Sequence, residues 1–121
     1  MATLSCANNN DKFSSTASYG NGLLTYPVGL ITADEVALAG GKYNMKNEKY
    51  YLRTNAYFWT MTPSRFNSSS AGTSEFNVYP TGLLSNDNVA SGLGLRPVIN
   101  LKSETMLSRG NGTVDHPFEI N

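Results

Sequence analysis

The stretch from Leu95 to Leu101 constrains the fold of this chain most, because it is the densest apolar run in the C-terminal half yet contains Arg96 and Pro97. Proline cannot donate a hydrogen bond to a sheet ladder, so it occurs at an edge, a strand start or a bulge. Arginine is almost never fully buried without a partner. The run therefore predicts a strand packed on one side only. Its arginine is expected to bond to backbone carbonyls or to Glu35 rather than to a ligand.

The composition favours one domain with an uncharged polar surface. The chain has 121 residues, of which 40% are hydrophobic, enough for one core. Only 15% are charged, and 9 Lys and Arg residues balance 9 Asp and Glu residues. Nucleic acids and anionic membranes need a basic patch, so neither is an expected partner. A surface rich in Asn, Ser, Thr and Tyr favours an extracellular or binding protein, and no apolar run reaches the ~20 residues of a membrane helix.

A short helix is predicted after the extended apolar segment 23–31. Thr32 and Glu35 have the spacing of a capping box, in which each side chain binds a free backbone N–H near the other residue. Gly40 and Gly41 are expected to end the helix, since glycine accepts the left-handed conformation found there. A helix of about two turns is not stable alone and must pack on a sheet. The side expected to do so contains Ile31, Val36 and Leu38.

Aromatic and β-branched residues predict a strand from Ala56 to Thr62 that Pro63 ends. Trp59 within it is interpreted as a core residue rather than a sugar-stacking platform. A β-hairpin is predicted from Glu75 to Val89, with its turn at residues 80–82 and with residues 86–88 interrupting its second strand. Alternation along its first strand predicts inward Phe76 and Val78 and outward Asn77 and Tyr79.

Catalytic and metal-binding interpretations find little support. The one histidine, His116, adjoins Asp115, which is too close in sequence to orient it easily in a Ser-His-Asp arrangement. One histidine and one cysteine do not complete a zinc site. The Asn-Asp-Asn run at 86–88 offers oxygen ligands to calcium, but such a site needs six or more, so a solvated turn is favoured. The sequence therefore predicts no enzyme, no catalytic residue, no cofactor and no metal.

Two stretches resemble a known family. The segment from Gly29 to Gly41 is similar to the capped helix of formylglycine-generating-enzyme-like proteins, and Gly94 to Val98 resembles their closing Gly-aromatic-Arg strand, with Leu95 in the aromatic position. That enzyme activity depends on a cysteine pair, whereas this chain contains only Cys6.

A closer resemblance is to a domain of bacterial surface and pilin-like proteins common in gut Firmicutes, and it covers nearly the whole chain. The matching segments are Cys6, residues 10–13, 20–31, the Trp-Thr-Met strand, 94–102 and 110–113. Both resemblances imply an α+β, C-type-lectin-like fold with a twisted, mainly antiparallel sheet, one short capped helix and long loops. They also imply that residues 1–121 are one domain, the C-terminal part of a larger one whose N-terminal half supplies a membrane anchor and a partner for Cys6.

The resemblance further implies a function. Diversified receptor proteins of this fold display variable residues just before the closing strand, here between Ser64 and Ser91. Tyrosine there gives rigid contact area, and Asn and Ser give adaptable hydrogen bonds. The predicted function is non-catalytic recognition of a protein or glycan by a bacterial surface module. The alternative is a pilin-like or fibre subunit whose polar face mediates assembly. The predicted ligand-binding residues are Arg65, Asn67, Ser68, Ser69, Asn77, Tyr79, Asn86, Asp87 and Asn88.

Overall fold

A computed structural model describes residues 2–12, 14, 18–20, 22–66, 72–113 and 115–121. Most of the regular structure is strand, with one α-helix in the described residues, which confirms the predicted α+β class. None of the described helices is long and apolar enough to cross a membrane. The elements are a 3-10 turn (Asn9–Asp11), β1 (Gly29–Leu30), α1 (Ala33–Leu38), β2 (Lys42–Tyr43), β3 (Phe58–Arg65), β4 (Ser74–Val78), β5 (Leu83–Asn88), β6 (Pro97–Val98), β7 (Leu107–Arg109) and β8 (Glu119–Ile120).

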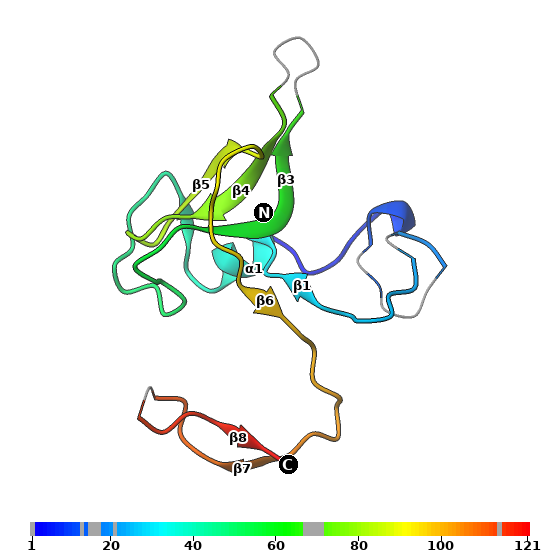
Figure 1. Cartoon of the computed structure of the whole chain (residues 1–121), viewed down its shortest axis with the longest axis vertical. Helices are drawn as coiled ribbons and strands as arrows, with labels where there is room; N and C mark the ends of the chain where they lie inside the picture. Colours follow the sequence, from blue (N-terminus) through cyan, green and yellow to red (C-terminus); the bar gives the residue numbers. More distant parts are fainter. Residues whose placement is uncertain (1, 13, 15–17, 21, 67–71, 114) are drawn as a thin grey trace.

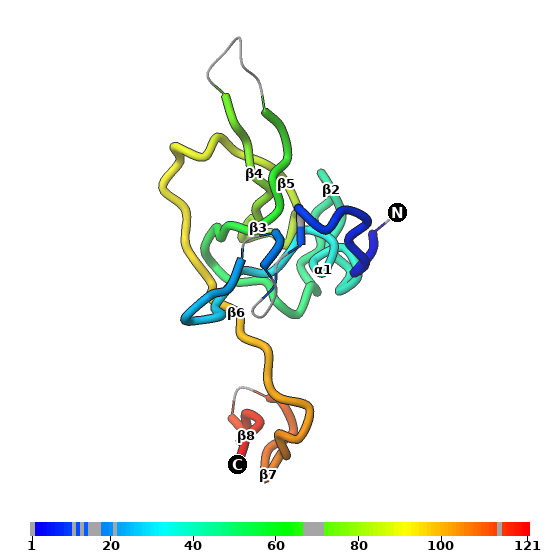
Figure 2. Tube along the Cα trace, turned by 90° about the vertical axis from the view of Figure 1, so that its right-hand side faces the viewer, coloured from blue at the N-terminus to red at the C-terminus, as the bar shows by residue number. Residues whose placement is uncertain are grey.

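The centre of the molecule is a four-stranded sheet in the order β2-β5-β4-β3. β4 is antiparallel to both of its neighbours, β5 and β3, and β2 runs parallel to β5. Helix α1 covers one face, and residues 89–96 cross the other (Figures 1 and 2). β1 pairs with β6 and lies beside β3, where the Met61 N–H donates to the Ile31 carbonyl at 3.0 Å. The mainly antiparallel sheet predicted from the sequence is confirmed.

The capping box of α1 is present as predicted. The Glu35 N–H donates to the Thr32 hydroxyl at 3.1 Å, and the Thr32 N–H donates to the Glu35 carboxylate at 2.8 Å. The chain leaves the helix through Gly40, whose φ of 101° is open to glycine. The expected inward position of Leu38 is wrong, because Leu38 is 58% exposed. Ala33 and Val36, three residues apart, form the buried face instead, since only residues three or four apart share a helix face.

The core lies between α1 and the sheet. Phe58 and Leu84 both lie next to Val78 in the ladder, so their side chains form one row across three strands. The cluster is completed by Ala33 and Val36 from the helix and by Tyr50 from the loop between β2 and β3. The Tyr50 hydroxyl is buried without a partner among the described residues, and burial, more than the neighbouring Tyr51, raises its pKa to about 12.

β3 departs from its predicted end at Pro63 and continues to Arg65. The ladder register shifts on both sides of Pro63, which shows how a residue without an N–H is accommodated inside a strand. The start of the strand is buried on both faces, because Phe58 and Thr60 point toward the helix side and Trp59 points the other way. The interpretation of Trp59 as a core residue is confirmed.

The closing run forms far less strand than predicted, since only Pro97 and Val98 pair, and only with β1. Arg96 does have fixed partners: its guanidinium donates to the Leu52 carbonyl and lies 4.7 Å from the centroid of the Phe58 ring. Of the two expected partner types, the carbonyl is therefore the one observed. The apolar residues around the pair lie at the surface instead of in a core. These residues are Leu95, Ile99 and Leu101.

Candidate functional site

The β4–β5 hairpin divides the predicted binding residues between two faces of the sheet. Successive side chains of a strand point to opposite faces, so Asn86 lies on the helix side and Asp87 on the other. The Asn86 side chain accepts a hydrogen bond from the Tyr43 hydroxyl at 2.9 Å. Asn88, exposed at the end of β5, turns its side chain to the Ala90 N–H. Residues 86–88 belong to β5, so the predicted interruption of this strand and its reading as a solvated turn are wrong.

On the face away from α1, Asn77 and Tyr79 converge on Asp87. The Asn77 amide donates to Asp87 Oδ2, and the Tyr79 hydroxyl donates to the same oxygen at 3.3 Å. Burial, followed by the charge of Asp87, raises the pKa of Tyr79, so its hydroxyl keeps the proton that it donates. We call Tyr57, Glu75, Asn77, Tyr79 and Asp87 the Tyr–Asp cluster.

The sequence-based expectation that Asn77 points outward into solvent is wrong, since its exposed fraction is 0%. Asn77 stands beside Trp59 in the ladder, on the face that residues 89–96 cross (Figure 1). Its Oδ1 atom has no partner among the described residues. Asn77 therefore cannot touch a ligand directly; it orients Asp87 from beneath.

Tyr57, which the sequence reasoning did not select, belongs to the same cluster. Its ring centroid lies 4.5 Å from that of Tyr79 with the ring planes at 66°, the edge-to-face arrangement that aromatic pairs prefer. Tyr57 is 41% exposed and so presents part of its ring to solvent. The signal for it was in the sequence: Tyr57 is two positions before Trp59, and alternation gives both the same face.

Glu75 lies opposite Asp87 in the ladder, and burial raises its pKa above the ordinary value of 4.5. Between pH 4.5 and that raised pKa the folded protein binds more protons than the unfolded chain, so this group lowers stability as the pH rises.

We expect Glu75→Gln to be more stable than the parent at pH 7, by about 0.5 kcal/mol or less because water screens the partly exposed group. At pH 4 we expect the parent and the variant to have the same free energy of unfolding. Urea unfolding at both values checks this, and a difference independent of pH would contradict it.

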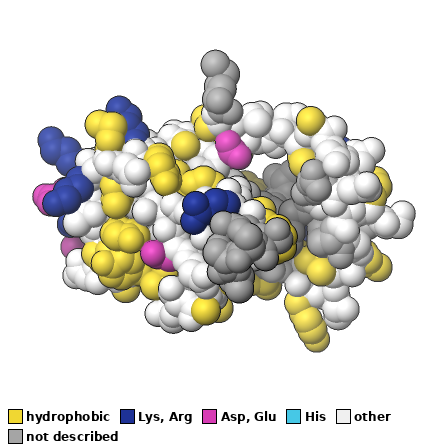
Figure 3. Space-filling model, turned by 90° about the horizontal axis from the view of Figure 1, so that it is seen from above, with side chains coloured by type: hydrophobic (Ala, Val, Ile, Leu, Met, Phe, Trp, Pro, Cys, Tyr) yellow, Lys and Arg dark blue, Asp and Glu magenta, His cyan; other side chains and the backbone are white. Residues whose placement is uncertain are grey.

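The remaining predicted residues lie toward the far end of the β3–β4 hairpin. Arg65 is exposed and pairs with Ser74 in the ladder. Asn67, Ser68 and Ser69 lie outside the described residues. Seen from this end, hydrophobic side chains lie scattered among uncoloured side chains and backbone, and several Lys and Arg side chains gather at the left edge (Figure 3).

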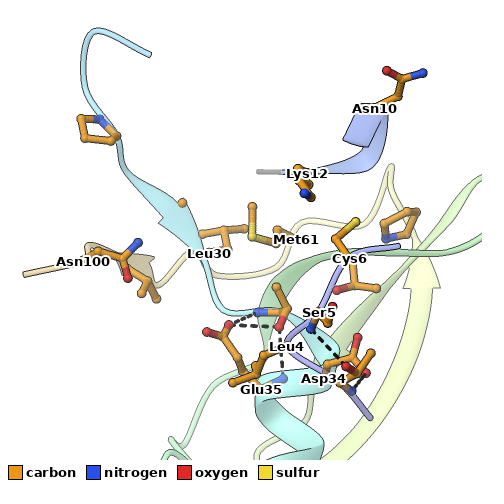
Figure 4. Close-up of a pocket in the computed structure, with 17 residues that line it drawn as sticks. Leu4, Ser5, Cys6, Asn10, Lys12, Leu30, Asp34, Glu35, Met61 and Asn100 are labelled. Atoms are coloured by element: carbon orange, nitrogen blue, oxygen red, sulfur yellow. Dashed lines mark hydrogen bonds between the residues drawn. The ribbon is translucent and has the colours of Figure 1, made fainter. Parts of the chain in front are cut away.

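A second concave feature is a groove of about 810 Å³ between the N-terminal segment and strands β1, β3 and β6. Leu30, Met61 and Val98 contribute apolar surface to it, and Cys6 and Lys12 line its other side (Figure 4). The groove escaped the sequence reasoning because its walls come from segments far apart in the chain.

The acidic residues at this groove are already engaged. Asp34 accepts a hydrogen bond from the Thr3 N–H at 3.0 Å, and Glu35 is part of the helix cap. Cys6 is an exposed free thiol whose Sγ donates to the Asn8 carbonyl at 3.3 Å. The groove is therefore a mixed surface, with an apolar wall from β1, β3 and β6 and polar side chains opposite, and its acids are not free for acid–base work.

The described part of the chain contains no cluster of metal-binding side chains. No three His, Cys, Asp or Glu side chains there are placed to hold a metal ion, and His116 is exposed. Comparison of the chain with protein-family models, with curated proteins and with solved structures gave no match.

Proposed function

We propose that the chain is a non-catalytic recognition module of C-type-lectin-like fold, displayed at a bacterial cell surface, and that it binds a protein or glycan through the Tyr–Asp cluster. One observation carries this proposal: an exposed Tyr57 ring is braced by Tyr79, whose hydroxyl is fixed by Asp87. Tyrosine offers a large, stiff contact surface with a polar end, which suits recognition of sugars and proteins alike.

The support for the cluster is rigid, which favours binding without a large loss of conformational freedom. Tyr79 and Asp87 stand at the turn and on a strand of one hairpin, and buried Asn77 ties the two strands together. Asp87 receives both bonds at Oδ2, so within the described residues Oδ1 is left to accept a bond from a ligand hydroxyl or amide. The cluster thus combines an aromatic surface with one oriented acceptor.

A glycan and protein array probed with the full chain tests the proposal. We expect Tyr57→Ala and Asp87→Asn each to weaken binding of any ligand found by about tenfold or more, as removal of a central aromatic or oriented polar contact does. Tyr51→Ala is the matched control, because Tyr51 is a surface tyrosine outside the cluster. Unchanged affinity in both cluster variants, with the fold intact, would place the binding surface elsewhere.

A second candidate function is that of an assembly subunit in a pilin-like or other fibre. It is favoured by a separate observation: β7 and β8 form a hairpin that lies apart from the sheet (Figures 1 and 2) and exposes Leu107, Phe118 and Ile120. An apolar hairpin of this kind is suited to contact between subunits rather than to ligand recognition.

A further inference from the structure

The C-terminal hairpin, residues 106–121, is held together by its own contacts. Leu107 pairs with Ile120 and Arg109 with Glu119. Within the described residues, the hydrogen bonds of this segment begin and end inside it. Figures 1 and 2 show it below the body of the protein, joined to β6 by an extended connection.

This hairpin presents an apolar face with nothing packed on it. Phe118, just before β8, is two positions from Ile120, so alternation directs both to the same side, and Leu107 stands beside Ile120 across the ladder. All three side chains are exposed. A lone two-stranded hairpin is at best marginally stable in water and needs a surface to pack against.

The body of the protein offers a surface of matching character at β6. This strand pairs with β1 along one edge, and no described strand lies along its other edge. An open, apolar strand edge is a template for pairing with another strand. The groove next to it has apolar walls from Leu30, Met61 and Val98, and its volume of about 810 Å³ leaves room for several side chains.

Charge restricts what can occupy this edge. No charged residue occurs from Leu23 to Ala33 or from Pro97 to Leu101. The charged side chains that line the adjoining groove are Lys12 on its far side and the helix acids Asp34 and Glu35, which are already hydrogen-bonded. A partner strand with unpaired charges against the apolar wall would lose their hydration there, which is unfavourable. The hairpin suits such a surface, because its strand charges, Arg109 and Glu119, are paired with each other at 4.0 Å.

We propose that the hairpin of one copy docks on the β6 edge and groove of a second copy, so that Leu107, Phe118 and Ile120 pack against Leu30, Met61 and Val98. The connection through Ile99 to Leu101 continues β6 away from its own body, which directs the hairpin outward (Figure 2). Two copies that exchange hairpins close a dimer, and one-way docking extends a filament. The contact deepens the assembly role, the second candidate function, and is independent of recognition by the Tyr–Asp cluster.

Sedimentation velocity of the full chain at rising concentration tests the contact. The parent protein is expected to associate, and Ile120→Asp on the hairpin and Val98→Asp on the edge are each expected to weaken association by about tenfold or more, because each buries a charge. Asn111→Asp is the matched control, since it adds the same charge in the turn of the same hairpin. A parent protein that stays monomeric throughout, or a control that weakens association equally, overturns the proposal.

Cross-linking identifies the docking partner. Cys6 lines the groove, so a second thiol introduced by Asn121→Cys, next to Ile120, should form a disulfide with it under mild oxidation. In a mixture of isotope-labelled and unlabelled protein, mass spectrometry should find mixed pairs, and Cys6→Ser should abolish them. Pairs formed only within one chain would mean that the hairpin docks on its own body, and the proposal fails. Ligand binding measured on Ile120→Asp separates this failure from that of the recognition proposal, since the Tyr–Asp cluster is unchanged in that variant.

Discussion

Phe58→Ala is expected to lower the free energy of unfolding by about 3–5 kcal/mol, the largest effect of any single substitution considered for this protein. Phe58 is 2% exposed, stands beside Val78 of β4 in the ladder and belongs to the same core cluster as Val36 of the helix. The guanidinium of Arg96 also lies over the face of the Phe58 ring. Removing the ring therefore opens a cavity at the point where three parts of the fold meet. Because domains are stabilised by only about 5–15 kcal/mol, much of the stability would be lost.

Urea unfolding followed by the fluorescence of Trp59, the single tryptophan, measures this effect directly, because Trp59 is buried next to the substituted position. Phe66→Ala provides a matched control, since Phe66 is 77% exposed and loses the same atoms without leaving a cavity. Its expected change is within about 0.5 kcal/mol of zero. Equal losses in the two variants would mean that Phe58 is not the centre of the core.

Arg96→Met is expected to have the second-largest effect and to lower the free energy of unfolding by about 2–3 kcal/mol. Methionine keeps the apolar stem but removes the bond to the Leu52 carbonyl and the contact over the Phe58 ring. A hydrogen bond from a charged group contributes about 1.5–3 kcal/mol, and a cation over an aromatic face about 0.5–2 kcal/mol. The conservative variant Arg96→Lys should lose less stability than Arg96→Met. Its ammonium can make a hydrogen bond, but lysine has no flat guanidinium to lie over the ring.

The same unfolding assay measures these variants, with Arg53→Met as the reference. Arg53 is an exposed arginine next to Leu52, so its replacement changes the charge by the same amount and in the same region. If Arg96→Met and Arg53→Met lose equal stability, Arg96 acts as a surface charge and the structural role assigned to it is wrong.

The elements predicted well from sequence are those whose bonds are local. The Thr32–Glu35 capping box spans three residues, and the turn at residues 80–82 places Gly82 at a φ of 71°, which glycine accepts readily. The alternation that gave the β4–β5 hairpin depends only on successive residues. In each case the sequence contains both partners of the interaction within a few positions.

The candidate site was predicted only in part. Tyr79 and Asp87 were selected for their residue types, and the structure brings them together. Asn77 was selected for the same reason but lies beneath the surface, because residues 89–96 cross that face of the sheet. Asn86 has suitable chemistry, but its side chain points to the helix side of the sheet, away from the cluster. Residue type identifies groups that can bind a ligand, whereas exposure depends on which distant segment covers them.

The sequence by itself determined the capped helix, the hairpin and the need for a partner at Arg96. Only the tertiary structure decided which carbonyl bonds to Arg96, that β3 passes through Pro63, and that the apolar run from Leu95 to Leu101 lies at the surface. The physical reason is the range of the interactions. Turns and caps are fixed by bonds between near neighbours, while burial is fixed by packing between segments tens of residues apart, which no local pattern specifies.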